Sequence, residues 1–546
     1  MQTAVAFWLF CGQSSASLTR IIAVQKSFEK ALAKIAEGGM EQHFLKLQRG
    51  IEKESLRVNS EGKLAQTRHP AALGSALTHS SITTDYSEAL LEFVTPIHTS
   101  IDTLLKELTD VHHYTYQNVD DEKLWVNSMP CVVEGEEKIP IARYGASNVA
   151  KMKEAYRRGL GHRYGRLMQT IAGIHFNFSL PDAFWDQYLT FSSSEDRLNK
   201  KSAAYFSLTR NFLRHSWLPC YLFGASPAVC KSFLRGRQHT LPDHDPHSFF
   251  APHATSLRLS GLGYSNDVQS SIDVCYNSLD EYTSTLRRAI QTPHPDYQAI
   301  EMVVDGKYQQ LNPNLLQIEN EFYAVIRPKQ VAHSGESPSR ALMDRGVAYV
   351  EIRSLDLNPY VPIGIDAECI RFFDLFLLYC LFSDDQPLST EERLQATENR
   401  QRAVMNGREE GLTLTFDDHN VPFAEAATDI LDALEPLAGM MDTLYGGSDY
   451  QTSLAAQRAK VQDSNLLPSA RILAEMEHDY DSFYAFAMAK AEQHETFFKQ
   501  QQLDPAILQS YRQEAAASLQ RQAEVEQADS VDFPAFLEEY FKLQNA

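Results

Sequence analysis

The sequence predicts an α+β fold in which helices flank a mainly antiparallel sheet and a helical part follows at the C-terminal end. Six segments alternate apolar and polar residues, as expected of strands with one buried and one exposed face. Segments with helical periodicity lie between them. After about residue 383 the composition shifts to Ala, Gln, Glu and Leu at helical spacing. We therefore expect residues 26–385 to form the sheet-containing domain and residues 386–546 a helical region packed on it.

The overall composition is that of a large globular protein. The chain has 546 residues, 43% hydrophobic and 22% charged, enough for a sizeable core. Its net charge of −21 argues against nucleic acid or an anionic membrane as the main partner. Seven cysteines are scattered without a C-x-x-C pair, which indicates a reducing cytoplasm rather than a disulfide framework or a zinc site. No apolar run approaches the ~20 residues of a membrane span.

The first 25 residues show no clear periodicity. Residues 4–11 are apolar, but the run is short and lacks a basic flank, so a secretory signal is not favoured. We expect residues 1–25 to be an extension that is disordered or precedes the true start. The first helix is expected over 27–37, with Ser27 as its cap.

The first two strands carry the acids on which the functional prediction depends. In 49–59, R-G-I-E-K-E-S-L-R-V-N, Glu52 and Glu54 project from one face about 6–7 Å apart. Two like charges in one row must be hydrated, paired or metal-bound, although a solvated face with two surface acids is the alternative. In 85–96, Glu92 lies between two apolar neighbours; the alternative there is an edge strand near solvent.

The other four segments repeat this pattern. In 173–181, G-I-H-F-N-F-S-L-P, His175 shares a polar face with an amide and a hydroxyl, which favours a ligand-facing surface over a structural histidine. The polar face of 255–260 carries Arg258. That of 315–328 carries Gln317, Glu319, Glu321 and Tyr323. That of 347–355 carries Tyr349, Glu351 and Arg353. The six polar faces would line a cup, with helices on the apolar faces.

Helices are expected between and after these strands. The predicted ranges are 101–120, 141–166 after an initial loop, 197–233, 278–291, 424–443, 468–502 and 505–527. The most apolar stretch, 372–382, is interrupted by Asp374, and we interpret it as a buried helix. Asp305-Gly306 indicates a hairpin turn.

The predicted cup carries the groups of a metal and phosphate site. Its carboxylates are Glu52, Glu54, Asp85, Glu92 and Glu351. Mg²⁺ prefers oxygen ligands and completes its shell with phosphate and water, while Arg353 and Arg258 would neutralise phosphate charge. The chain has neither a G-x-x-x-x-G-K-[ST] nor a G-x-S-x-G motif, which excludes a P-loop enzyme and a serine hydrolase of the usual kind.

These motifs together resemble the glutamate–cysteine ligase family of the gammaproteobacterial type. The resemblance runs from about Leu47 to Leu414, and the C-terminal helices match less well. Its main blocks are R-G-I-E-K-E-S-L-R-V-N, the 85–96 segment, M-Q-T-I-A-G-I-H-F-N-F-S-L-P, A-T-S-L-R-L-S, L-Q-I-E-N-E-F-Y and Y-V-E-I-R-S-L-D-L-N-P.

The resemblance implies a cup-shaped sheet similar to the catalytic sheet of glutamine synthetase, so that 26–385 would be the catalytic domain. It implies that ATP phosphorylates the γ-carboxylate of L-glutamate and that the α-amine of L-cysteine attacks the acyl phosphate, the first step of glutathione biosynthesis. It also implies Mg²⁺, or alternatively Mn²⁺, feedback inhibition by glutathione and a monomer. The implied metal ligands are Glu52, Glu54, Asp85, Glu92, His175 and Glu351; the implied catalytic residues are Arg353, Glu351 and Arg258; and the implied substrate-binding residues are Tyr156, Gln169, Ile171, Arg258, Tyr264 and Tyr323.

Two other functions remain open from the sequence. One is a carboxylate–amine ligase of the same fold that uses another amine. The other is a non-catalytic nucleotide or metal sensor, which the complete set of acids together with Arg353 disfavours, because a sensor does not need charge placed for transfer.

Overall fold

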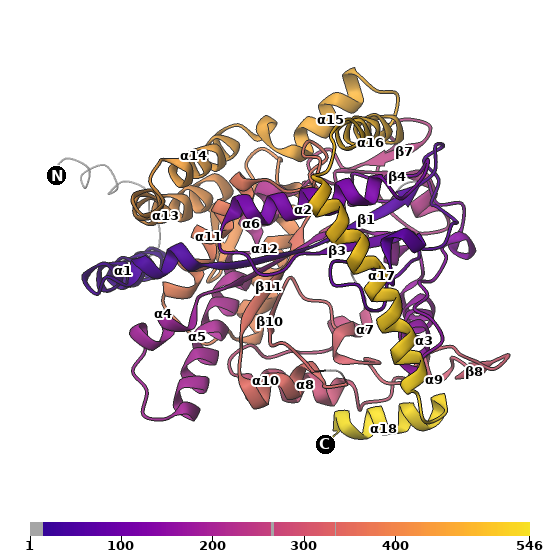
Figure 1. The fold of residues 1–546 in the computed structure, drawn as a ribbon. Helices are drawn as coiled ribbons and strands as arrows, with labels where there is room; N and C mark the ends of the chain where they lie inside the picture. The colour runs from indigo at the N-terminus through magenta and orange to yellow at the C-terminus, as the bar shows by residue number, and fades with distance from the viewer. Residues whose placement is uncertain (1–14, 131, 264–266, 334, 546) are drawn as a thin grey trace.

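The computed structural model describes residues 15–545 except 131, 264–266 and 334. Helices surround a central antiparallel sheet, and the C-terminal helices, in orange to yellow, lie along the top of the view and descend to its lower edge (Figure 1). Among the described residues, no helix has the length and apolar character needed to cross a membrane.

The central sheet has seven strands, and every pairing in it is antiparallel. The strand order is β10-β11-β5-β1-β3-β2, with β4 paired to the far end of β1. The bounds are β1 Gln48–Val58, β2 Ile82–Thr84, β3 Leu90–Val94, β4 Lys123–Leu124, β5 Ile174–Ser179, β10 Ile326–Lys329 and β11 Tyr349–Leu355. Four of the six predicted strands, now β1, β3, β5 and β11, are thereby confirmed.

The register brings the predicted polar faces together. Glu54 on β1 lies opposite Glu92 on β3, and Glu52 lies opposite His175 on β5. On the other side of β5, Asn177 lies opposite Glu351 of β11. Side chains of directly opposed residues share a face at roughly 5 Å, so these polar groups form one continuous patch.

The opposite face of the sheet is buried under helices. These are α2 (Ile101–Tyr116), α5 (Ser194–His215), α6 (Trp217–Phe223) and α11 (Ala367–Phe382), and they contact β1, β10 and β11 or one another. The ring of Phe176 on β5 packs against Phe373 of α11 with centroids 5.7 Å apart. All residues from Phe372 to Phe382 are buried, which confirms the predicted buried helix. Asp374 is tolerated there because Arg49 of β1 donates two hydrogen bonds to it, each 2.7 Å long.

The remaining elements form the outer layer. The helices are α1 Ser15–Glu37, α3 Asn148–Tyr164, α4 Asp182–Tyr188, α7 Asp267–Ser270, α8 Leu279–Ala289, α9 Pro295–Gln298, α10 Pro338–Arg345, α12 Thr390–Asn406, α13 Phe423–Tyr445, α14 Asp449–Gln462, α15 Pro468–His478, α16 Phe483–Gln500, α17 Pro505–Ala528 and α18 Phe533–Asn545. Three small hairpins are β6 Ala228–Cys230 with β7 Ser248–Phe250, β8 Val303–Val304 with β9 Lys307–Tyr308, and β12 Thr413–Phe416 with β13 His419–Pro422. The C-terminal helices contact the rest of the protein through α11, α2 and α3.

Several predicted boundaries are wrong. The first helix begins at Ser15 rather than at Ser27, and so includes residues 15–25. Residues 1–14 lie outside the described residues. The predicted helix 468–502 is two helices, separated at residues 479–482. The helical C-terminal region also contains the β12–β13 hairpin, whose turn residues Asp417 and Asp418 have positive φ.

Two predicted strands are also wrong. Residues 257–259 form a 3-10 helix because the backbone N–H of Thr255 donates to Val404 at the end of α12, and the Ser256 hydroxyl caps the turn. Of 315–328, only the end from Ile326 onward is a strand. Earlier in that segment the backbone N–H of Gln317 donates to the side-chain carboxylate of Glu321 in the same segment, so it does not pair with a neighbouring strand. The Asp305-Gly306 hairpin is confirmed as the turn between β8 and β9.

Candidate active site

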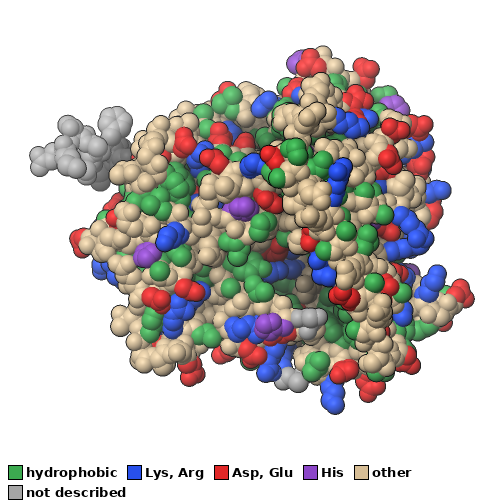
Figure 2. Space-filling model, viewed as in Figure 1, with side chains coloured by type: hydrophobic (Ala, Val, Ile, Leu, Met, Phe, Trp, Pro, Cys, Tyr) green, Lys and Arg blue, Asp and Glu red, His purple; other side chains and the backbone are tan. Residues whose placement is uncertain are grey.

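The polar face of the sheet opens into a cavity of about 490 Å³. Strands β1, β3, β5, β10 and β11 form its floor, while α3, residues 311–323 and one residue of α18 form its walls. Figure 2 shows that the face viewed in Figure 1 is hollowed near its centre, where blue Lys and Arg side chains lie at depth. The cavity is lined by six carboxylates (Glu52, Glu54, Asp85, Glu92, Glu321 and Glu351) and by six cationic side chains (Lys153, Arg157, Arg237, Arg327, Lys329 and Arg353). A strongly acidic protein thus offers a local set of cations suited to an anionic ligand.

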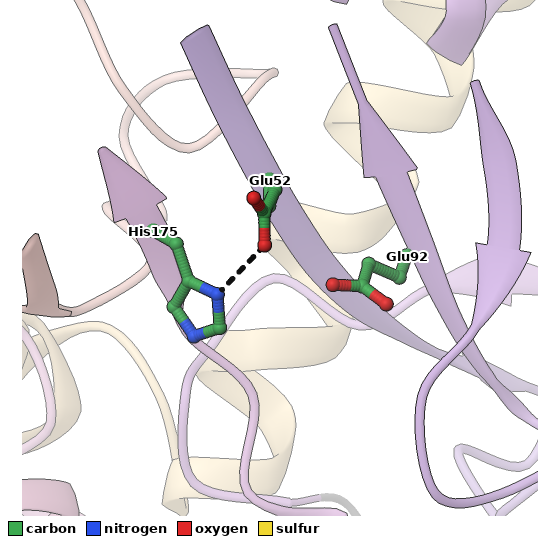
Figure 3. A group of neighbouring side chains, drawn as sticks. All are labelled: Glu52, Glu92 and His175. Carbon is green, nitrogen blue, oxygen red and sulfur yellow. Dashed lines mark hydrogen bonds and ion pairs between the residues drawn. The ribbon is translucent and has the colours of Figure 1, made fainter. Parts of the chain in front are cut away.

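A group of metal-ligand type lies on three neighbouring strands. Glu52, Glu92 and His175 each offer one donor atom, and these three atoms lie within 4.8 Å of one another (Figure 3). The Nδ1 of His175 is 3.2 Å from one carboxylate oxygen of Glu52, and the amide of Asn177 donates to the other at 2.9 Å. Two carboxylates and an imidazole at this spacing fit a small divalent cation.

Glu54 is held at the edge of this group by the backbone. The N–H of Gly173 donates to it at 2.7 Å, and its second oxygen is 4.0 Å from the Nε2 of His175. A side chain at position 173 would collide with Arg258, since an added Cβ would lie 2.0 Å from its guanidinium. Gly173 therefore lets a carboxylate and a buried guanidinium approach the same point of the backbone.

The electrostatics of the acidic cluster favour a bound cation. Burial, and then the nearby Asp85, raises the pKa of Glu92 well above its ordinary value. The same two causes raise the pKa of Glu54. Burial and Glu351 oppose the ionisation of Glu52, but the hydrogen bond and electrostatic attraction of His175, together with Lys329, outweigh them, so the pKa of Glu52 is lowered. A cation that binds among such clustered acids offsets their mutual repulsion and favours their ionised form.

Glu351 and Arg353 lie on the other side of the cluster, next to β10. The carboxylate of Glu351 is 3.3 Å from Arg353 and 3.5 Å from Lys329. Burial opposes the ionisation of Glu351, but Lys329 and Arg353 prevail and hold its pKa below the ordinary range. Arg327, also buried, donates to the backbone oxygen of Asn320 at 3.1 Å. Three cations converge on one carboxylate, which leaves positive charge available to a phosphoryl group.

Of the residues implied to bind substrate, Tyr156, Gln169 and Tyr323 line the cavity. Arg258 and Ile171 do not; each is only 1% exposed, and substrate contact at these positions stays a prediction. Arg258 instead donates to the backbone oxygen of Arg353 at 2.9 Å. Tyr264 lies outside the described residues.

The residues predicted to share the polar face of 315–328 do not lie on one face. Glu321 pairs with Arg163 at 3.0 Å and lines the cavity, but Glu319 turns away to cap α10 through Ser339. Sequence reasoning also missed the cations of α3 and β10 and the side chain of Tyr540. The basic helix K-M-K-E-A-Y-R-R was a usable signal for Lys153 and Arg157, whereas nothing near Tyr540 in the sequence points to a cavity.

A cavity floor of carboxylates and one histidine beside converging arginines is typical of enzymes that transfer phosphoryl groups. Comparison with known proteins identifies the family. The family model described as glutamate-cysteine ligase matches residues 32–403. Glutamate–cysteine ligase of Alcanivorax borkumensis is 49% identical over 91% of this chain and 95% of its own length. That of Pseudomonas putida W619 is 49% identical over 90% and 94%. This chain belongs to the glutamate–cysteine ligase family.

Solved structures agree with this assignment. The glutamate–cysteine ligase of Francisella tularensis in complex with AMP superposes with a TM-score of 0.85 at 34% identity, covering 91% of this chain and 98% of that one. A bifunctional glutathione synthetase from Pasteurella multocida, at 23% identity and a TM-score of 0.68, shares the fold.

Proposed function

We propose that this protein joins the γ-carboxylate of L-glutamate to the α-amine of L-cysteine with ATP, giving γ-glutamylcysteine, ADP and phosphate, the first step of glutathione biosynthesis. The observation that carries the proposal is the placement of Glu52, Glu92 and His175 in the same cavity as Arg353, in a chain of this family.

The reaction needs two displacements. A γ-carboxylate oxygen of glutamate attacks the terminal phosphorus of ATP, and the bond to ADP breaks to leave an acyl phosphate. The amine nitrogen of cysteine then attacks the acyl carbon, phosphate leaves with the bonding electrons, and the nitrogen loses a proton. Arg353, Arg327 and Lys329 stabilise the negative charge that moves onto phosphate oxygens, because phosphoryl transfer depends mainly on positioning and charge neutralisation.

We propose Mg²⁺, or Mn²⁺, as the cation of the acidic cluster. Glu52, Glu92 and His175 would hold it, and Glu54, Asp85 and Glu351 line the same cavity. The raised pKa values of Glu92 and Glu54 support this assignment, because unpaired buried acids would otherwise repel one another. When bound, the cation neutralises phosphate charge and fixes the orientation of the phosphate chain.

The amino-acid substrates are assigned to the part of the cavity lined by Tyr156, Gln169 and Tyr323. Arg258 would act from behind the wall, through its hydrogen bond to the backbone of Arg353. Glutathione contains the γ-glutamylcysteinyl unit of the product, so we propose that it competes at this cavity. We also propose a monomer that works in the cytoplasm; the described cysteines are free thiols, as a reducing compartment requires.

The test is ATP-dependent phosphate release with glutamate, in the presence and absence of cysteine. Replacing cysteine by 2-aminobutyrate or by a simple alkylamine separates a cysteine ligase from a ligase for another amine. We expect phosphate release to require glutamate and to be fastest with cysteine. Phosphate release that is faster with an alkylamine would assign a different acceptor, and no release with any amine would leave only the sensor.

A further inference from the structure

The last helix of the chain lies at the edge of the active-site cavity. α18 packs on α3, where Leu537 is buried against Ala155 and Leu311. At its start, the ring of Phe533 meets Tyr308 edge-on with centroids 5.1 Å apart. At its end, the amide of Gln544 donates to the backbone of Gly335, in the loop before α10. The helix thus joins α3 and residues 308–311 to the loop before α10, and Figure 1 shows it, in yellow, at the lower edge of the molecule.

The chain before α18 is tied down at the same place. The carboxylate of Asp529 accepts from the backbone N–H of Asn148 at 2.6 Å, and the amide of Asn148 donates to the backbone of Val531 at 2.9 Å. Asn148 is the first residue of α3, the helix that supplies one wall of the cavity. The position of α18 is therefore set by the wall it covers and does not depend on solvent-exposed contacts alone.

One side chain of α18 reaches the cavity itself. Tyr540 lines it together with Tyr156, Ile318 and Arg327. Burial, and then the nearby Glu319, raises the pKa of Tyr540 to about 12, so its hydroxyl is neutral at physiological pH. Among the described residues no hydrogen bond to this hydroxyl is found, and the ring is the part of the side chain that packs, between Phe536 and Phe541.

We propose that α18 is the outer wall of the active site and that the ring of Tyr540 keeps water from the acyl phosphate. The inference rests on the proposed ligase reaction. α18 lies outside the residues 32–403 that the family model matches, and no part of that match assigns it a role.

The acyl phosphate intermediate needs such a wall because it can react with water. Water can attack the same acyl carbon as the cysteine amine; the carbon–oxygen bond breaks, phosphate leaves and glutamate is regenerated. ATP is then consumed without a peptide bond. An enzyme with an acyl phosphate intermediate therefore needs a closed site until the amine arrives. The cationic and carboxylate side chains of the cavity floor do not supply an apolar barrier, whereas the apolar cluster around Leu537 and the ring of Tyr540 do.

The experiment compares phosphate released with γ-glutamylcysteine formed, in the full-length protein with Mg²⁺, ATP, glutamate and limiting cysteine. For the unmodified protein we expect a ratio close to one. For Tyr540→Ala we expect the ratio to rise to about two or more, because water gains access to the intermediate. Tyr540→Phe keeps the ring and should restore a ratio near one. Leu543→Ala, at a position of the same helix that is 60% exposed, is the matched control and should behave as unmodified protein.

The outcomes separate the two proposals and the structural role of the helix. No γ-glutamylcysteine from the unmodified protein would overturn the proposed function itself. Normal product from the unmodified protein with a ratio near one in Tyr540→Ala would overturn the role of α18. A variant that lost activity and thermal stability together while its ratio stayed near one would also overturn it, because lost packing lowers the amount of active enzyme without changing the ratio. Uncoupling as large in Tyr540→Phe as in Tyr540→Ala would refute the barrier role of the ring.

Discussion

The Asp374→Asn variant tests how the catalytic sheet is joined to the helices behind it. Asp374 of α11 receives two hydrogen bonds from Arg49 of β1, each 2.7 Å long, and both side chains are fully buried. A third hydrogen bond, 2.9 Å long, comes from the hydroxyl of Tyr450 on α14. One carboxylate thus connects the first residues of β1 with the C-terminal helical region.

The expected loss follows from what the substitution leaves behind. Asparagine has nearly the same shape, so little packing is lost, but the guanidinium of Arg49 stays buried without its counter-charge. Removing one partner of a buried ion pair costs about 3–5 kcal/mol. Tyr450→Phe removes only one hydrogen bond to the charged group and should cost about 1.5–3 kcal/mol. Replacing both partners of the ion pair by apolar residues, as Arg49→Met with Asp374→Leu, should cost less than Asp374→Asn alone.

The assay is urea-induced unfolding followed by far-ultraviolet circular dichroism, with the free energy taken from the shift in midpoint and the m-value. Activity with glutamate, cysteine and ATP reports whether the folded fraction keeps its site. A loss below about 1 kcal/mol for Asp374→Asn, or one no larger than that of Tyr450→Phe, would refute the reasoning, because the buried charge would then be compensated by something other than Asp374.

Three further predictions concern the sheet itself. Glu92→Gln should lower ligation at least ~100-fold. In EDTA at pH 7–8 the same variant should melt at a higher temperature than the unmodified protein. A carboxylate whose pKa is raised in the folded state destabilises the fold once the pH exceeds the pKa of the unfolded state. Full activity of the variant at ordinary Mg²⁺ would remove Glu92 from the metal site. Arg353→Lys should be as inactive as Arg353→Ala, with the loss in kcat rather than in the KM for cysteine. The reason is that a single ammonium group does not replace the planar guanidinium, which binds two phosphate oxygens at once. A change in the KM for cysteine alone would contradict this role. Burial behind the sheet lowers the pKa of Lys53 to about 7, so Lys53→Met should raise the free energy of unfolding at pH 7 by about 4 kcal/mol. The gain should shrink towards pH 10, where unfolded lysine also loses its proton. A gain that does not depend on pH would show that charge burial is not the cause.

The local pattern of the sequence was sufficient for the strands that carry most of the site. A period of two places Glu52 and Glu54 on one face, and it places His175 and Glu351 on the polar faces of their own strands. The same reasoning failed for 255–260, because a short alternating segment becomes a strand only where a neighbouring strand accepts its hydrogen bonds. Arg258 consequently lies behind the cavity wall instead of on a strand face.

The sequence by itself determined which side chains share a face of each strand, because that depends only on the backbone geometry of neighbouring residues. The tertiary structure decided which strands are neighbours and in which register. β5 lies between β1 and β11, so that Glu52 meets His175 across one strand boundary and Asn177 meets Glu351 across the next. It also decided that Tyr540, near the end of the chain, completes a cavity whose first acid is Glu52. Strand order, register and helix placement follow from hydrogen bonds and packing between residues far apart in the chain, and no local period encodes those contacts.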